Sequence, residues 1–118
     1  RDSGDMNLDV LARFERLLDD YLTQGAAAKE GLPSVRYFAS KICLSPNYFG
    51  DLVTKETGKS AQEYIQLKMI DAAKEGLLDP NKTIGQVAYE LGFQYPQHFV
   101  RFFKRHVGYT PREYRLQS

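Results

Sequence analysis

The sequence predicts an all-α fold of about seven helices. Its apolar residues follow helical spacing with almost no alternating strand pattern, caps and glycines separate the apolar stretches, and a unit of about 50 residues occurs twice. At 118 residues, of which 42% are hydrophobic and 26% charged, the chain has the size and composition of one globular domain. No apolar run approaches the roughly 20 residues that span a bilayer, which excludes a membrane-embedded protein.

The two copies of the repeat match at nearly constant spacing. Ala39 corresponds to Ala88 at an offset of 49 residues, and Phe49 corresponds to Phe99 at an offset of 50. The second copy therefore has one extra residue in its turn. The other matched pairs are Leu44 with Phe93, Pro46 with Pro96, Lys55 with Arg105, Gly58 with Gly108, Ser60 with Thr110, Glu63 with Glu113 and Tyr64 with Tyr114.

The first copy predicts two helices joined by a turn of about three residues. Ser34 caps a helix that runs to about Ile42. Ser45 caps the second helix, Pro46 takes its first position, and Gly58 ends it. The apolar face of the first helix consists of Val35, Phe38, Ala39 and Ile42.

A long helix over residues 60–78 links the two copies. Ser60 and Glu63 have the spacing of a capping box, in which each side chain bonds the other residue's backbone N–H. Asp79-Pro80 stops the helix, because proline lacks the N–H that a continuing helix needs.

The second copy repeats this pattern. Its first helix starts at the capping box Thr83–Gln86 and ends at Gly92. Its second helix starts at Tyr95-Pro96 and ends at Gly108. A further capping box, Thr110–Glu113, starts a last short helix.

Two helices joined by so short a turn cross steeply, so the second helix projects from the body of the domain. This is the helix-turn-helix arrangement, whose second helix enters the major groove of DNA. Plain helical bundles contain such turns as well. The residues on the exposed faces of the two second helices therefore distinguish a plain helical bundle from a DNA-binding domain.

In the second copy, Gln97, Arg101 and Lys104 share one exposed face at helical spacing. Gln pairs bidentately with adenine and Arg with guanine, so Gln97 and Arg101 are predicted base contacts. Lys104, Arg105 and His98 are predicted phosphate contacts, with packing at the helix margin as the alternative for His98. The residues predicted to face the core are Phe99, Phe102, Phe103 and Val107.

In the first copy, Asn47 and Asp51 are the predicted base contacts, and Lys55 and Lys59 the predicted phosphate contacts. Gly50 between them offers no side chain. The Asp51 carboxylate repels phosphate, so it requires either a cytosine amine or a basic neighbour. We therefore predict that this helix contributes less to base recognition than the second helix of the second copy.

Residues 1–33 predict a helix with the apolar stripe Leu8, Leu11, Phe14, Leu18 and Leu22, followed by a loop over Gln24–Pro33. The predicted organisation is an N-terminal helix and loop over 1–33, a first helix-turn-helix over 34–59, a linker helix over 60–79, and a second helix-turn-helix with a C-terminal helix over 80–118.

Charge is distributed unevenly along the chain. The net charge is +1, but residues 80–118 carry six basic and two acidic side chains, whereas residues 1–33 carry four basic and seven acidic ones. A basic C-terminal third fits an anionic partner or a solvated basic face.

The composition argues against several other classes of protein. Cys43, the single cysteine, excludes disulfide and zinc-finger scaffolds, fits a reducing cytoplasm, and is expected to be a small buried turn residue. We expect no signal peptide, because the chain starts with polar residues. We also expect no enzyme, no cofactor and no metal, because the two histidines share one helix and no phosphate-binding loop or metal motif occurs.

Several of these stretches together resemble the AraC/XylS family of bacterial transcription regulators, over about residues 34–116. The residues that carry the resemblance are Ser45-Pro46-Asn47-Tyr48-Phe49, Leu91-Gly92-Phe93, His98-Phe99-Val100-Arg101-Phe102-Phe103-Lys104 and Gly108-Tyr109-Thr110-Pro111-Arg112-Glu113-Tyr114-Arg115.

The resemblance implies two homeodomain-like helix-turn-helix subdomains tied by one long helix, with both recognition helices in successive major grooves near a promoter. By position it places Asn47, Gly50 and Asp51 against bases in the first motif, and Gln97, Val100 and Arg101 in the second. The implied partners are double-stranded DNA and RNA polymerase, without a membrane. It also implies a sensing or dimerising domain in a part of the chain outside these 118 residues.

A helical protein-interaction module that keeps the fold but binds DNA weakly or not at all is the alternative. The low net charge and the first recognition helix favour it. The cationic face of the second recognition helix opposes it.

Overall fold

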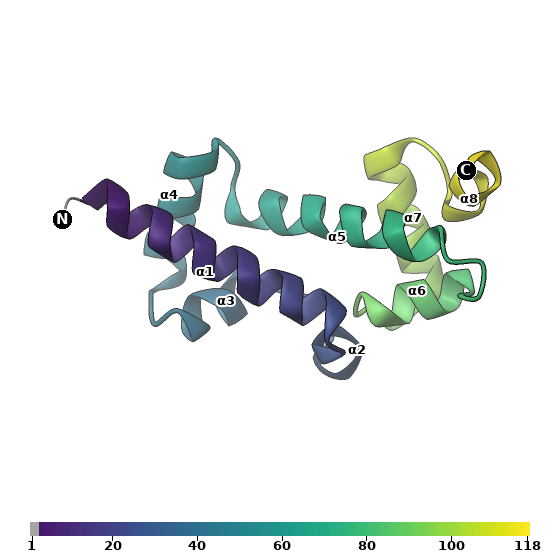
Figure 1. The fold of residues 1–118 in the computed structure, drawn as a ribbon, viewed down its shortest axis with the longest axis horizontal. Coiled ribbons are helices and arrows are strands. Elements are labelled where there is room, and N and C mark those ends of the chain that lie inside the picture. Colours follow the sequence, from purple (N-terminus) through teal and green to yellow (C-terminus); the bar gives the residue numbers. More distant parts are fainter. Residues whose placement is uncertain (1–2) are drawn as a thin grey trace.

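The computed structural model describes residues 3–118 and contains, in that part of the chain, eight helices and no strand (Figure 1). The helices are α1 (Ser3–Thr23), α2 (Ala26–Glu30), α3 (Val35–Lys41), α4 (Pro46–Thr57), α5 (Ala61–Leu77), α6 (Ile84–Glu90), α7 (Pro96–Val107) and α8 (Pro111–Gln117). The predicted all-α fold is confirmed. Residues 1 and 2 of the expected N-terminal segment lie outside the described residues.

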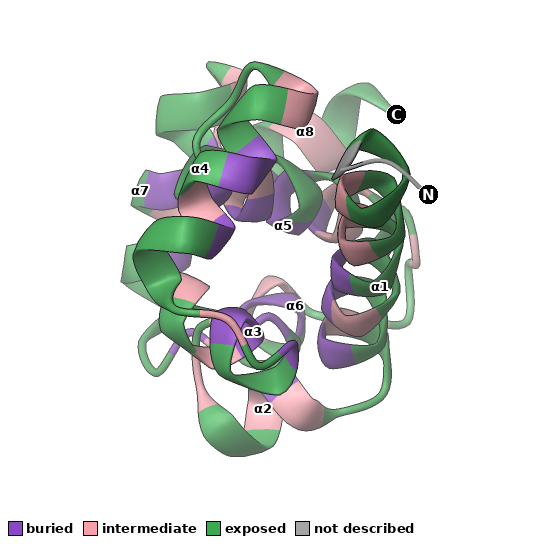
Figure 2. Cartoon of the chain, turned by 90° about the vertical axis from the view of Figure 1, so that its left-hand side faces the viewer, coloured by how far each residue is buried: buried purple, intermediate pink, exposed green. Residues whose placement is uncertain are grey.

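The helices are arranged around α5, which runs along the middle of an elongated molecule of 49 × 27 × 20 Å (Figure 1). The first motif, α3 and α4, packs at one end of α5, and the second motif, α6 and α7, packs at the other end together with α8. Helix α1 lies along one side of α5. Figure 2 shows α4 and α7 on the side of α5 opposite to α1.

Aromatic rings form the core of both halves. The Phe14 ring of α1 lies 5.4 Å from the Phe38 ring, 4.8 Å from Phe49 and 5.4 Å from Tyr64, measured between centroids. In the second half, Phe99 packs against Phe93 and Phe103. The predicted core face of α7 is confirmed, because its three phenylalanines are buried and Val107 is partly buried against the core.

Serine and threonine caps begin most of the helices where the sequence places them. The Ser34, Ser45 and Ser60 hydroxyls each accept a bond from the backbone N–H three residues later. The capping boxes at Thr83 and Thr110 are complete. The one expected at Ser60 is only half formed, because the structure gives the Ser60 cap bond but no return bond from Glu63.

The predicted loop over Gln24–Pro33 is wrong, because α2 forms inside this segment and brings the helices of residues 3–118 to eight, where about seven were predicted. Its sequence is Ala-Ala-Ala-Lys-Glu, and alanine has the highest helix propensity. Gly25 and Gly31, both in the left-handed region at φ 89° and 99°, bound it. Ala27 is completely buried, and α2 packs against α6. Tertiary packing therefore stabilises a helix that is too short to persist alone.

Two side-chain placements also differ from expectation. Leu8 is 54% exposed, so the buried stripe of α1 starts further along and includes Tyr21. Cys43 is exposed rather than buried and adopts φ 66°. It occupies the turn position that Gly92 takes in the second motif. No helix of residues 3–118 has the length and apolar character to cross a membrane.

Candidate nucleic-acid interface

The recognition helix of the second motif, α7, has one buried and one cationic face. Pro96 takes its first turn and Gly108, at φ 92°, ends it. Gln97, Arg101 and Lys104 are all exposed on the face away from the core, as predicted, and Arg105 is exposed beside them. Helix α7 contains no acidic residue. Its outward face therefore offers amide, guanidinium and ammonium donors.

The basic end of α7 is also favourable for the helix itself. Lys104, Arg105 and His106 stand in its last turn, where positive charge complements the helix dipole. His106 is occupied by packing, because its Nδ1 lies 3.0 Å from the Phe102 carbonyl oxygen and its ring lies 4.6 Å from the Phe102 ring. Lys104 lies near Glu113. The bonds from Thr110, and after them the Lys104 charge, lower the pKa of Glu113.

His98 is exposed at the start of α7, next to Gln97. Its ring stands edge-on to the Tyr95 ring at 5.6 Å between centroids. Tyr95 is 49% exposed, so this pair lies on the surface rather than in the core.

The recognition helix of the first motif, α4, presents a different surface. Phe49, Leu52 and Val53 are buried, while Asn47 and Asp51 are exposed. A Cβ added at Gly50 would meet no atom within 4 Å, so the helix backbone is open to close approach there. The Thr54 hydroxyl donates to the Gly50 carbonyl oxygen at 3.0 Å.

Asp51 forms no ion pair within the described chain, although Lys55 follows it one turn further along α4. Among residues 3–118 the structure gives no ion pair and no hydrogen bond for its carboxylate. Lys55 and Lys59, the predicted phosphate contacts, are exposed toward and beyond the C-terminal end of α4. The outward surface of α4 thus combines an amide, an open backbone, a free carboxylate and peripheral ammonium groups.

Helix α4 carries one further candidate DNA contact that the sequence analysis did not predict. Tyr48 is 57% exposed in the first turn, beside Asn47. The repeat offset of 50 residues aligns Tyr48 with His98, so the repeat could have drawn attention to it. Its phenolic hydroxyl is able to bond phosphate or a base edge.

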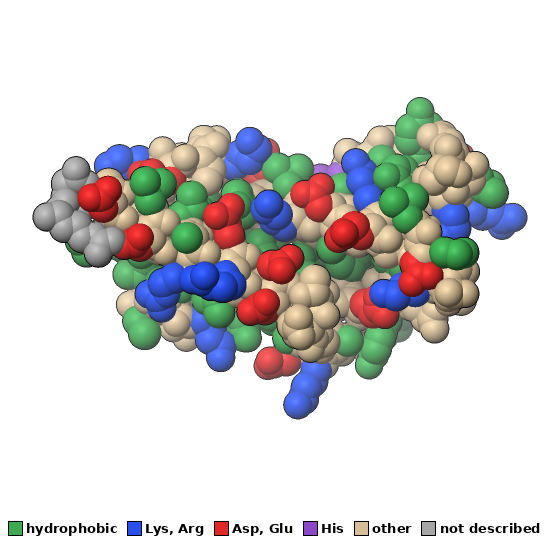
Figure 3. Space-filling view, in the orientation of Figure 1, with side chains coloured by type: hydrophobic (Ala, Val, Ile, Leu, Met, Phe, Trp, Pro, Cys, Tyr) green, Lys and Arg blue, Asp and Glu red, His purple; other side chains and the backbone are tan. Residues whose placement is uncertain are grey.

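Both recognition helices lie on one side of the molecule. Figure 2 places α4 and α7 together and α1 opposite. Figure 3 views the α1 side, on which Asp and Glu side chains are interspersed with Lys and Arg. The face on the α1 side therefore lacks the single sign of charge that α7 carries.

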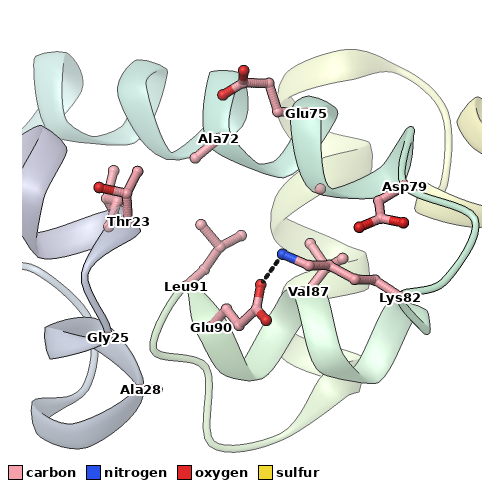
Figure 4. A pocket seen from close by; sticks show the side chains of 12 residues that line it. Thr23, Gly25, Ala28, Ala72, Glu75, Asp79, Lys82, Val87, Glu90 and Leu91 are labelled. Atoms are coloured by element: carbon pink, nitrogen blue, oxygen red, sulfur yellow. Dashed lines mark hydrogen bonds and ion pairs between the residues drawn. The ribbon is translucent and has the colours of Figure 1, made fainter.

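Three cavities among residues 3–118 are lined in part by α5, and a further one of about 610 Å³ lies between α2 and the turn from α6 to α7, with His98 in its wall. The cavity of Figure 4, about 370 Å³, is enclosed by α1, α2, α5 and α6. Lys82 and Glu90 at its edge pair at 2.8 Å, and this pairing raises the pKa of Lys82. Within residues 3–118, no cluster of three metal-ligating side chains occurs.

The family profile described as a helix-turn-helix domain matches residues 38–117. The chain belongs to the AraC/XylS family of transcription regulators, as a helix-turn-helix DNA-binding domain. The AraC/XylS resemblance read from the sequence is thereby confirmed.

Two relatives come from Bacillus subtilis (strain 168). The chain is 40% identical over 70 residues to the "Uncharacterized HTH-type transcriptional regulator YobQ", covering 59% of this chain and 29% of that protein. It is 29% identical over 122 residues to the "Uncharacterized transcriptional regulatory protein YesN", covering 98% of this chain and 31% of that protein. The chain thus spans about three tenths of the length of these relatives.

Solved structures share the fold. The C-terminal domain of AraT, a response regulator from Geobacillus stearothermophilus, matches with a TM-score of 0.74 at 22% identity over 89% of this chain and 85% of that one. The C-terminal domain of the two-component response regulator yesN from Fusobacterium nucleatum matches with a TM-score of 0.71 at 24% identity over 86% of this chain and 96% of that one.

Proposed function

We propose that the chain reads a two-box DNA site, with α7 as the principal reader and α4 as the secondary one. The observation that carries this proposal is the exposed outward face of α7, which has basic and no acidic side chains, on the same side of the molecule as α4. Catalysis forms no part of the proposed role.

In α7, Gln97 and Arg101 contact base edges, while Lys104, Arg105 and His98 contact phosphates. Gln97 and Arg101 stand one turn apart near the N-terminal end of the helix, which is the end that contacts base edges in helix-turn-helix proteins. Bidentate pairing predicts adenine opposite Gln97 and guanine opposite Arg101. The basic last turn of α7 lies further along, where it meets the backbone of the groove wall.

In α4, Asn47 and Asp51 contact bases, and Lys55 and Lys59 contact phosphates. Because Asp51 forms no ion pair in the described structure, its carboxylate is available to accept a bond from a cytosine amine. The missing side chain at Gly50 permits α4 to approach the groove floor closely enough for this short side chain to reach.

The spacing of the two helices favours a bent duplex. Helix α5 has 17 residues and is therefore about 25 Å long, and α4 and α7 pack toward its two ends. Successive major grooves on one face of straight DNA are about 34 Å apart. Bending the duplex toward the protein, at a cost of about 1–6 kcal/mol, brings the grooves to the helices.

We further propose that this DNA-binding domain acts in the cytoplasm, near a promoter, and affects transcription by contact with RNA polymerase. We also propose that a sensing or dimerising domain accompanies it in the longer protein. The length of the relatives supports this, because the chain matches only 29% and 31% of two of them.

The test is selection of bound duplexes from a random DNA pool at near-physiological salt, followed by affinity measurements across a salt series. We expect two short boxes about one helical turn apart and a steep fall in affinity with salt. A single box would restrict base reading to α7. No enrichment by a folded protein would overturn the proposal in favour of the interaction-module alternative.

A further inference from the structure

The first motif (α3 and α4) and the second motif (α6 and α7) are held together by other elements of the fold rather than by extensive direct contact. Neither α3 nor α4 makes an extensive contact with α6 or α7 within residues 3–118. Two elements bridge them: the linker helix α5, and the segment formed by α1 and α2, which contacts the first motif through α1 and the second through α2. Residues 3–37 lie outside the part that matches the family profile.

Helix α1 is packed into the hydrophobic core of the first motif. Phe14 is completely buried among rings of α3, α4 and α5. In the last turn of α1, Tyr21 is 5% exposed and packs against Tyr37 at 4.9 Å and Phe38 at 5.6 Å between ring centroids. Any displacement of α1 would therefore disturb the core of the first motif.

Tyr21 carries this attachment on to the end of α2. Its hydroxyl donates to the Gly31 carbonyl oxygen at 2.7 Å. Burial, followed by the negative charge of Glu30, raises the pKa of Tyr21, so the hydroxyl remains a donor at physiological pH. The carbonyl group that ends α2 is thus held from the side of the first motif.

The opposite side of Gly31 contacts the second motif. The backbone of Gly92 packs so closely here that an added Cβ would lie 2.5 Å from the Gly31 carbonyl oxygen and 2.8 Å from the Leu32 nitrogen. Gly92 is the turn residue between α6 and α7, at φ 101°. A single carbonyl group is therefore held by the first motif and touches the turn that aims the recognition helix of the second.

We infer that Tyr21, Gly31 and Gly92 form a joint that fixes the distance and rotation between α4 and α7, and so selects the base-pair spacing between the two boxes. This inference rests on the proposed function. The three residues act as positioning residues and do not touch DNA.

The first experiment measures affinity for a series of duplexes that carry the two selected boxes at spacings varied one base pair at a time. The test variant is Tyr21→Phe, which keeps the ring and removes only the hydroxyl. The matched control is Tyr37→Phe, in the same aromatic cluster, whose hydroxyl has no hydrogen bond in the described structure.

We expect Tyr21→Phe to reduce the preference for the best spacing over its neighbours by about threefold to tenfold, the range that one hydrogen bond supports, with unchanged base preferences in each box. Tyr37→Phe should keep the wild-type preference. The inference is overturned if Tyr21→Phe keeps it as well, or if it loses affinity equally at every spacing.

A second experiment needs no DNA and separates the joint from the proposed function. Cys43 is exposed in the first motif, and Arg112→Cys adds one exposed site on α8, which packs against α7. Spin labels on this pair report the distance between the two halves. We expect a narrow distribution that broadens with Tyr21→Phe and not with Tyr37→Phe.

If the wild-type protein selects no DNA sequence, the proposed function is wrong, and the joint is then tested by this distance distribution alone. A distribution that Tyr21→Phe leaves unchanged would overturn the joint even in a protein that binds its two boxes tightly.

Discussion

The two motifs have the same scaffold and different outward surfaces. Phe49 and Phe99 are both completely buried at matched positions, and both recognition helices begin with proline. Outside this scaffold, α4 presents an unpaired carboxylate at Asp51, where α7 presents the guanidinium of Arg101. The matched buried positions are apolar in both helices, whereas the matched position at Asp51 and Arg101 reverses its charge.

Their turns differ in a second way. Cys43 and Gly92 both take the left-handed conformation, and the residue after each donates to a carbonyl five residues earlier, at 2.9 Å in the first turn and 3.0 Å in the second. Only Gly92 lies against another backbone. The same local geometry is thus exposed in one motif and part of an inter-motif contact in the other.

The largest expected effect is a loss of stability on removing a buried phenylalanine, and it should be similar in the two motifs. Phe49→Ala and Phe99→Ala should each lower the free energy of unfolding by about 3–5 kcal/mol, because each leaves a cavity in a fully buried site. Urea titration of the two variants measures both values. A small loss for one of them would mean that its half of the domain is dispensable for stability.

Alanine substitution should destabilise the domain more at Gly92 than at Gly58. For Gly92→Ala we expect a loss of about 2–5 kcal/mol, since the left-handed conformation and the approach to Gly31 both oppose a Cβ. Gly58→Ala is the control, because Gly58 is also left-handed, at φ 77°, but has nothing within 4 Å of an added Cβ. It should lose only about 1–2 kcal/mol in the same unfolding assay. Equal losses would remove the argument for a tight contact at Gly31.

DNA affinity should depend more on α7 than on α4. Arg101→Ala should weaken binding by roughly 1–3 kcal/mol and relax specificity at one base pair. Asp51→Ala should relax specificity at a C·G pair with a smaller loss of affinity, because it also removes a charge that phosphates repel. Quantitative binding to single-base variants of the site checks both. A larger loss of affinity for Asp51→Ala would reverse the assignment of principal reader.

Lys104→Ala should act without regard to sequence. We expect affinity to fall by a similar factor on every duplex, with the slope of log affinity against log salt reduced by about 1. Thr54→Ala, at the matched position of α4, removes no charge and should leave that slope unchanged. A sequence-dependent effect of Lys104→Ala would place this side chain at a base edge.

The smallest effect should come from the first turn. Cys43→Gly should stabilise the domain by up to about 1 kcal/mol, because glycine adopts φ 66° without the cost that a Cβ imposes, offset in part by its greater freedom when unfolded. The thermal midpoint should rise slightly. A lower midpoint would indicate that the Cys43 side chain contributes packing that its exposure does not suggest.

The sequence by itself determined the features that depend on neighbouring residues. Caps such as Ser45 and Thr83, the glycines that end α4 and α7, and the buried and exposed faces of α7 follow from short-range bonds and from the period of the helix. The repeat added the equivalence of the two motifs, and with it the recognition of the family.

Only the tertiary structure decided which of these local patterns are buried, paired or brought together. Leu8 fits the apolar stripe of α1 yet is exposed, although the adjacent Asn7 bonds Glu56 of α4. Helix α2 is too short to predict from propensity, and it forms with Ala27 buried while the helix packs against α1 and α6. The contact of Gly31 with Tyr21 and Gly92 joins residues up to 71 positions apart, and no sequence period encodes such a meeting.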